Sequence, residues 1–238
     1  MTVTRAYRAG PDRSRAKGPA AAAPRSGREP AVESAPRSDV RARRRLDLMR
    51  RAQAAALDLF EARGFDQVTI EEIAAICDVS PPTIYRHFGT KEQLVLWDEY
   101  DSIVFEGVAE HLRSLSPLDA LRAAILTPLD RIYALDAQRV LRRVRLAERE
   151  PSVGAARNAG LRLFRSAVAH SLVEARACRD AFEADVLAGA FLVALDTAIE
   201  HWAKADAARP LRYFIQRALR DLAAFGKQAR TIETRKGR

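Results

Sequence analysis

The stretch VSPPTIYRHFGTKEQL, residues 79–94, concentrates side chains that can recognise a polyanion. Hydroxyl, imidazole and ammonium groups donate hydrogen bonds to phosphate oxygens, which position a protein on a duplex without reading its sequence. Arg86 can also offer paired donors to O6 and N7 of a guanine in the major groove. The candidate contacts within this stretch are Thr83, Tyr85, Arg86, His87 and Lys91.

Three of these side chains also have simpler interpretations. Tyr85 could pack against a neighbouring helix, and His87 could be a satisfied histidine at a helix end. Arg86 could be plainly solvent-exposed, or contact phosphate without reading a base. The choice depends on whether these residues lie on an exposed helix.

The first of two short helices is predicted by a capping box. Thr69 and Glu72 are three residues apart, so each side chain can accept from the backbone N–H of the other. A tight turn follows at Asp78, a residue type that tolerates the left-handed conformation. The expected inner face of this helix comprises Ile70, Ile73, Ala74 and Cys77.

The second short helix contains the candidate contacts. Ser80 is expected at its N-cap and Pro81 at its first position, and Gly89 ends it. Ile84 and Phe88 are four residues apart and should face inward, which leaves the polar side chains outside. Two short helices joined by a tight turn and supported by a third predict a helix-turn-helix.

The flanking sequence predicts one supporting helix on each side. The helix before the motif begins near Ser38 and ends at Gly64, with Phe65 packing back on it. Its inner face is expected to comprise Leu46, Met49, Gln53, Ala56, Leu57 and Phe60. Thr90 with Gln93 opens the next helix, which is expected to run unbroken through Trp97, Tyr100 and Val108.

The remaining sequence has helical periodicity throughout, so the predicted fold class is all-α. One helix is expected to start at Ser116–Pro117 and kink at Pro128. Further helices are expected over residues 137–149 and 152–177, from Asp180 to about Lys204, and from Pro210 to a stop at Gly226.

Residues 46–94 resemble the DNA-binding domain of the TetR family of regulators. The resemblance is carried by Phe60, Gly64–Phe65, Thr69, Ile73–Ala74, Val79–Ser80, Thr83, Tyr85, His87–Phe88 and Lys91–Glu92. It implies a dimeric transcriptional regulator, usually a repressor, that a small ligand releases from a palindromic operator. The DNA-binding residues expected from the motif and the resemblance are Thr69, Ser80, Pro81, Pro82, Thr83, Tyr85, Arg86, His87 and Lys91.

The sequence departs from the family pattern at Pro81 and Pro82, where many members have a basic and a small residue. Each proline removes a backbone N–H from a helix start that could otherwise bind phosphate. The position tolerates proline because these N–H groups have no partner within a helix. The flat surface of Pro82 suits a thymine methyl group.

The charge distribution places the expected partner at one end of the molecule. The net charge is +9, and residues 1–40 carry eight basic but only four acidic side chains. We expect residues 1–40 to be a disordered basic arm, 41–92 the DNA-binding domain, 93–226 an effector-binding and dimerisation domain, and 227–238 a basic tail. The simpler interpretation is that the charged tails only keep the chain solvated.

The second domain is expected to hold a pocket for an apolar or amphipathic effector. The residues assigned to it are Leu121, Ile125, Leu129, Leu141, Val144, Phe164, Val168 and His170. The same apolar residues would serve equally in an ordinary core, and a single histidine is often structural. Arg142, Arg143 and Arg145 could meet an anionic end of the effector or remain solvated. The resemblance implies a homodimer through residues 181–226.

Other function classes find less support in the sequence. It has no catalytic triad, no paired carboxylates in apolar context and no cysteine spacing for a metal, so no enzyme activity, cofactor or metal is expected. Cys77 and Cys178 are read as buried thiols in a reducing, cytoplasmic setting. The alternatives are a non-specific nucleoid-type DNA binder and, with less support, an enzyme built on the helical domain.

Overall fold

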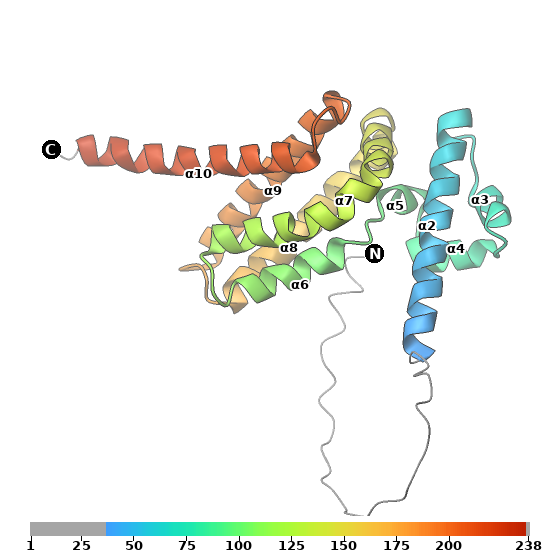
Figure 1. Ribbon diagram of the computed structural model, residues 1–238, viewed down its shortest axis with the longest axis horizontal. Coiled ribbons are helices and arrows are strands. Elements are labelled where there is room, and N and C mark those ends of the chain that lie inside the picture. The colour runs from blue at the N-terminus through green and yellow to red at the C-terminus, as the bar shows by residue number, and fades with distance from the viewer. Residues whose placement is uncertain (1–36, 237–238) are drawn as a thin grey trace, which may run out of the picture.

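The computed structural model describes residues 37–236, and these residues form α-helices without any strand. The predicted all-α fold is therefore confirmed. Of the arm predicted over residues 1–40, residues 1–36 lie outside the described residues, whereas residues 37–40 belong to the first helix, so the predicted boundary is wrong there. The helices, labelled as in Figure 1, are α2 (Arg37–Arg63), α3 (Ile70–Ile76), α4 (Pro81–Phe88), α5 (Lys91–Leu96), α6 (Asp101–His111), α7 (Pro117–Arg149), α8 (Pro151–Glu174), α9 (Ala181–Lys204) and α10 (Leu211–Lys236).

The two halves of the chain occupy different parts of the molecule. Helices α2, α3 and α4 lie together at one end, and α6 to α10 form a helical bundle at the other (Figure 1). Helix α5 lies between them, and the last turns of α10 project beyond the bundle. No described helix has the length and apolar character needed to cross a membrane.

Local signals set the ends of the N-terminal helices as predicted. The capping box of Thr69 and Glu72 is complete, and the backbone at Asp78 is left-handed with φ of 54°. Gly64 and Gly89 follow α2 and α4 with φ of 87° and 83°, values that favour glycine. These three turns fix the directions of α2, α3 and α4.

A first hydrophobic core joins α2 to α5. The Phe60 and Phe65 rings lie 4.9 Å apart, and Phe88 packs edge-on against Trp97. Leu146 and Val153, from α7 and α8, also belong to this core. The N-terminal half therefore packs on the bundle through continuous apolar contact.

The second hydrophobic core lies within the bundle, where helices α6 to α10 pack against one another. Its largest fully buried side chains include Trp202 and Phe191 of α9, with Leu141 of α7 and Leu172 of α8. Cys77 is buried as expected, while Cys178 is only half-buried.

The helix predicted to run from Thr90 through Val108 is wrong, because it is divided into α5 and α6. Trp97 ends α5 with an extended ψ of 125°. The amide nitrogen of Gln53, fully buried on α2, lies within 2.9–3.0 Å of the carbonyl oxygens of Leu94, Val95 and Trp97. A side chain from α2 thus takes the place of the N–H groups that a continuing helix would have supplied.

Two other predicted helix boundaries are also wrong. Residues 137–149 do not form a separate helix but continue α7, which contains Pro128. Arg212 of α10 donates to the carbonyl of Leu126 at 3.0 Å, close to the proline that lacks an N–H. Helix α10 passes through Gly226 and includes most of the predicted basic tail, since one glycine costs a helix only about 1 kcal/mol.

Candidate nucleic-acid interface and ligand cavity

Helix α4 buries one face and exposes three of the side chains proposed to contact nucleic acid. Ile84 and Phe88 are 0% and 1% exposed, whereas the Tyr85 side chain is among the exposed large residues at 48%. Pro82 and Arg86 are exposed as well. The packing alternative for Tyr85 therefore finds no support in this geometry.

The start of α4 differs in detail from the prediction. Ser80 occupies the N-cap position, but its hydroxyl makes no capping bond. Pro81 and Pro82 have no N–H to offer, and the Thr83 N–H already donates to the Ser80 carbonyl at 2.8 Å. The Ser80 hydroxyl instead lies 3.0 Å from that of Thr83, to which Arg86 also donates at 3.4 Å. Ser80, Thr83 and Arg86 thus form one polar row on α4.

Thr69 and Glu72 organise the start of α3. The Thr69 hydroxyl accepts from the Glu72 N–H at 3.2 Å, and Glu72 accepts from the Thr69 N–H at 2.9 Å. The backbone bond from Thr69 and the ion pair with Arg63 hold the pKa of Glu72 below its usual value. Thr69 remains exposed, so its expected contact with DNA is sterically open.

Lys91 has an intrachain role that the sequence did not indicate. Its ammonium group donates to the carbonyl oxygens of Phe65 and Val68 at 2.8 and 3.0 Å. It also lies 4.3 Å from the centre of the Phe65 ring, within cation–π range. Lys91 therefore fastens the loop between α2 and α3 to the start of α5, and its phosphate contact stays a prediction. Pro81, Thr83 and His87 are half-buried.

We expect Lys91→Ala to lower the free energy of unfolding by about 1–3 kcal/mol, because two carbonyls lose a charged donor. Lys91→Arg should recover part of that loss. Urea unfolding followed by circular dichroism measures both changes. An alanine variant as stable as the parent would show that the ammonium contacts carry no net energy.

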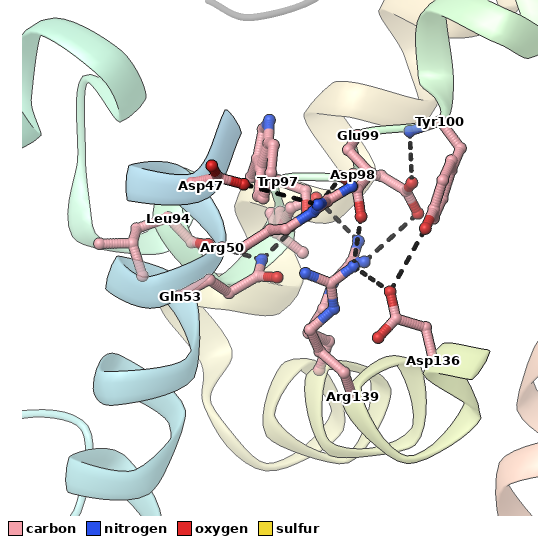
Figure 2. A network of polar contacts seen from close by, with 12 residues as sticks. Asp47, Arg50, Gln53, Leu94, Trp97, Asp98, Glu99, Tyr100, Asp136 and Arg139 are labelled. Carbon is pink, nitrogen blue, oxygen red and sulfur yellow. Dashed lines mark hydrogen bonds and ion pairs between the residues drawn. The ribbon is translucent and has the colours of Figure 1, made fainter. Parts of the chain in front are cut away.

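A polar network connects the two halves of the molecule at the break between α5 and α6 (Figure 2). Glu99, whose side chain is 4% exposed, accepts from Arg50 of α2 at 2.7 Å and from Arg139 of α7 at 2.8 Å. Arg139 also pairs with Asp136, and the Tyr100 hydroxyl lies 3.4 Å from the same carboxylate. One buried carboxylate thus holds α2 and α7 together through the intervening segment.

The protonation states of the network follow from its contacts. Burial alone would raise the pKa of Glu99, but the bonds from Arg139 and Arg50 lower it below its usual value. Burial and the neighbouring Glu99 raise the pKa of Tyr100, so its hydroxyl remains protonated. Glu99 is consequently charged at neutral pH between its two arginine partners.

A cavity of about 280 Å³ lies directly beside this break. The end of α5 and the start of α6 form one wall, with Leu96, Trp97 and Asp101. Helices α7 to α10 complete a mostly apolar lining, which also contains two arginines and two further aspartates. The volume is near the lower end of the range for small-molecule sites, about 300–1,000 Å³.

The cavity coincides only in part with the predicted pocket. Val144 and Phe164 line the cavity. Leu161, three residues before Phe164 on α8, lines it as well. The other apolar residues assigned to the pocket instead pack in the bundle core: Leu121, Ile125, Leu129, Leu141 and Val168. His170 is on the surface, 3.2 Å from Glu174, so it is not an anchor inside this cavity.

The three arginines expected near the effector have different roles. Arg142 bonds to Asp58 and Glu61 of α2, and Arg145 bonds to Asp206. Only Arg143 lines the cavity, where it also donates to carbonyls of α5. The cluster of arginines on α7 is visible in the sequence. Their partners cannot be identified there, because they lie more than 40 positions away along the chain.

The sequence did not indicate a role for the residues at the break between α5 and α6. Gln53 lies on the otherwise apolar inner face of α2, and a polar side chain in that position indicates a buried hydrogen-bond partner. Asp98, Glu99 and Asp101 follow Trp97 closely, and three acids after an apolar run could have suggested a helix end. Their arginine partners on α2 and α7 could not be read from spacing.

Comparisons with known proteins agree with this arrangement. A family model described as "Bacterial regulatory proteins, tetR family" matches residues 53–96, and a model of the "MftR C-terminal domain" matches residues 115–226. Together they include the helix-turn-helix and most of the bundle.

Two curated relatives match part of the chain. The HTH-type transcriptional regulator TcmR of Streptomyces glaucescens is 30% identical over 105 residues, which are 41% of this chain and 46% of the relative. The putative mycofactocin biosynthesis transcriptional regulator MftR of Mycobacterium tuberculosis (strain ATCC 25618 / H37Rv) is 31% identical over 74 residues, 30% of this chain and 37% of the relative. The chain thus spans less than half the length of either relative.

Solved structures show the same fold at low sequence identity. The SmeT–triclosan complex has a TM-score of 0.52 and 16% identity, covering 75% of this chain and 90% of that one. The fatty acid degradation regulator FadR from Bacillus halodurans has a TM-score of 0.51 and 16% identity, covering 74% and 94%.

Proposed function

The chain belongs to the TetR family of transcriptional regulators, and we propose from this that it is a repressor which a small ligand releases from a palindromic operator. The observation that carries the proposal is the exposure of Pro82, Tyr85 and Arg86 on α4. In the same molecule a cavity lies beside the break between α5 and α6, and this break contacts α2. The helix-turn-helix provides the DNA-binding surface, and the cavity provides a place for the ligand.

The DNA-binding side is supported by the chemistry of α4. Recognition helices of this motif enter the major groove with their N-terminal residues toward base edges. Pro82 is exposed in the first turn of α4 and suits a thymine methyl, and Arg86 is exposed in the last turn, from which its long side chain suits a guanine. The proposed phosphate and groove contacts are Thr83, Tyr85, His87 and Lys91.

Selection of bound duplexes from random DNA, followed by competition, tests this proposal. The protein should enrich a palindrome whose half-sites are about one helical turn apart. It should retain that duplex against a thousandfold excess of random DNA, since specific sites bind on the order of 10³–10⁷ times more tightly. Enrichment of no sequence would favour the nucleoid-type alternative.

The proposed coupling runs from the cavity to α2. A ligand beside Trp97 and Asp101 would shift the segment between α5 and α6. That segment is bound to α2 through Gln53 and through the Glu99–Arg50 pair, so its movement changes the position of the helix-turn-helix. Ligand and operator would then favour different arrangements of one two-state element.

The bundle has an exposed apolar face that suits a homodimer through residues 181–226. Phe182, Val186 and Val193 lie on one side of α9 and are 77%, 55% and 67% exposed. Tyr213 of α10 is exposed as well. Such a face on two helices fits a self-complementary interface, and a dimer would set two α4 helices for two half-sites.

Val193→Glu should therefore convert the dimer into a monomer and weaken palindrome binding by at least tenfold. The side chain is exposed within the chain, so the helical content should be retained. Sedimentation velocity measures the assembly state, and fluorescence anisotropy measures DNA binding. The matched control is Leu163→Glu, at an exposed leucine of α8 outside this face; equal effects of both changes would argue against the interface.

A further inference from the structure

The cavity is lined by more acidic than basic side chains, and this excess restricts the charge of a ligand that can bind there. Three carboxylates and two guanidinium groups line the cavity: Asp98, Asp101, Asp196, Arg143 and Arg157. The rest of the lining is apolar except for Gln93. When all five groups are ionised, the lining carries one more negative than positive charge.

Both arginines are already engaged by the protein. Arg143 donates to the carbonyls of Val95 and Leu96 at 3.1 Å and to Asp98 at 3.3 Å. Arg157 pairs with Asp196 of α9, and its other terminal nitrogen lies 3.9 Å from Glu200. An anionic ligand would have to displace an internal carboxylate to bind either guanidinium.

Asp101 is the group without such a match. Its carboxylate makes no hydrogen bond or ion pair within 4.0 Å to another part of the chain that the structure describes. It is half-buried at the start of α6, and the neighbouring Asp98 repels its charge while Arg143 attracts it. A half-buried carboxylate without a protein donor is less favourable than one to which a ligand supplies a donor.

We infer that this cavity selects a small cationic amphiphile, whose ammonium group pairs with Asp101 while its hydrocarbon part lies against Trp97, Val144 and Phe164. This inference rests on the proposed function, because it takes the cavity to be the effector site, and it specifies the chemical class of the effector. A protonated amine supplies both the charge and the N–H donors that Asp101 lacks. A neutral chain would leave the carboxylate unpaired, and an anionic one would face the excess negative charge.

Three probes with the same alkyl chain separate these possibilities: octylammonium, 1-octanol and octanoate. We expect isothermal titration at pH 8 to show octylammonium binding at least tenfold more tightly than either other probe. Asp101→Asn should reduce this preference to less than threefold. Glu106→Gln removes one charge from an exposed position on the same helix and should leave the preference unchanged.

The pH dependence provides a second readout. Burial and the charge of Asp98 raise the pKa of Asp101 to about 7, and Arg143 opposes this shift. The other charged groups that line the cavity are Asp196 and Arg157. The preference for octylammonium should therefore fall between pH 8 and pH 6, where Asp101 becomes protonated while the amine, with a pKa of about 10, stays charged.

The titration contains no DNA, so its result does not depend on operator binding. Equal or tighter binding of octanoate, no binding of any probe, or a preference that survives Asp101→Asn would overturn the cationic ligand class. A repressor that still binds its operator in those cases would keep the proposed function and require a different ligand. A cation preference in a protein that selects no operator would support the ligand class and refute the repressor.

Discussion

Replacing Glu99 with glutamine is expected to lower the free energy of unfolding by about 2–4 kcal/mol at pH 7. The Glu99 side chain is 4% exposed and contacts Arg50 and Arg139, which belong to different halves of the molecule. Removing one partner of a buried ion pair typically costs about 3–5 kcal/mol. The loss should be at the lower end, since Arg139 keeps Asp136 and the half-exposed Arg50 can reach water.

Urea unfolding at one fixed protein concentration measures this loss, because the stability of a dimer depends on concentration. Asp47→Asn is the matched control: Asp47 lies 3.8 Å from Arg50, but the pair is exposed and should contribute less than about 1 kcal/mol. Equal effects of the two changes would contradict a special role for Glu99.

The pH dependence distinguishes the charge of Glu99 from its packing. The folded-state pKa of Glu99 lies below its usual value of 4.5, so its contribution is complete above that pH. It is lost as the pH falls through the folded-state pKa. The stability difference between parent and Glu99→Gln should therefore shrink below pH 4.5, and a constant difference would indicate a packing effect.

The same change should weaken the response of the operator complex to its ligand. In the proposed coupling, Glu99 transmits the shift of the α5–α6 segment to Arg50 of α2. The ligand should then reduce operator affinity by a smaller factor in Glu99→Gln than in the parent. Operator binding measured with and without ligand gives this factor directly.

The N-terminal fold could be predicted because its signals are local. The capping box at Thr69, the left-handed turn at Asp78 and the glycines at 64 and 89 each involve residues at most a few positions apart. Ile84 and Phe88 then fixed which face of α4 is buried. The exposure of Tyr85 and Arg86 followed from that one periodicity, whereas Thr83 and His87, also expected outside, are half-buried.

The break after α5 could not be predicted in the same way. It depends on Gln53, whose amide reaches carbonyls more than 40 residues later in the chain. The cavity presents the same difficulty, since the periodicity of α7 and α8 identifies buried residues without distinguishing core from cavity wall. Leu141 packs in the core and Val144 faces the cavity, although both are apolar residues of one helix.

Arg86→Ala should cost about 1–3 kcal/mol in binding to the selected operator and little in binding to random duplex, if Arg86 reads a guanine. Arg86 is exposed, and its one side-chain contact within the motif is the 3.4 Å bond to Thr83, so the variant should fold with nearly unchanged stability. Anisotropy titrations on both duplexes, at several salt concentrations, measure the two effects.

Arg122→Ala is the control, because it removes the same charge from an exposed position on α7, far along the chain from α4. A phosphate contact by Arg86 would give a different result, since phosphates are present in every duplex: both affinities would fall together, and the salt slope would decrease by about one unit. In that case base reading would pass to Pro82 and Tyr85, the other exposed side chains of α4. Because proline and tyrosine recognise a thymine methyl better than a guanine edge, the selected half-site would then be expected to be rich in A·T pairs opposite α4.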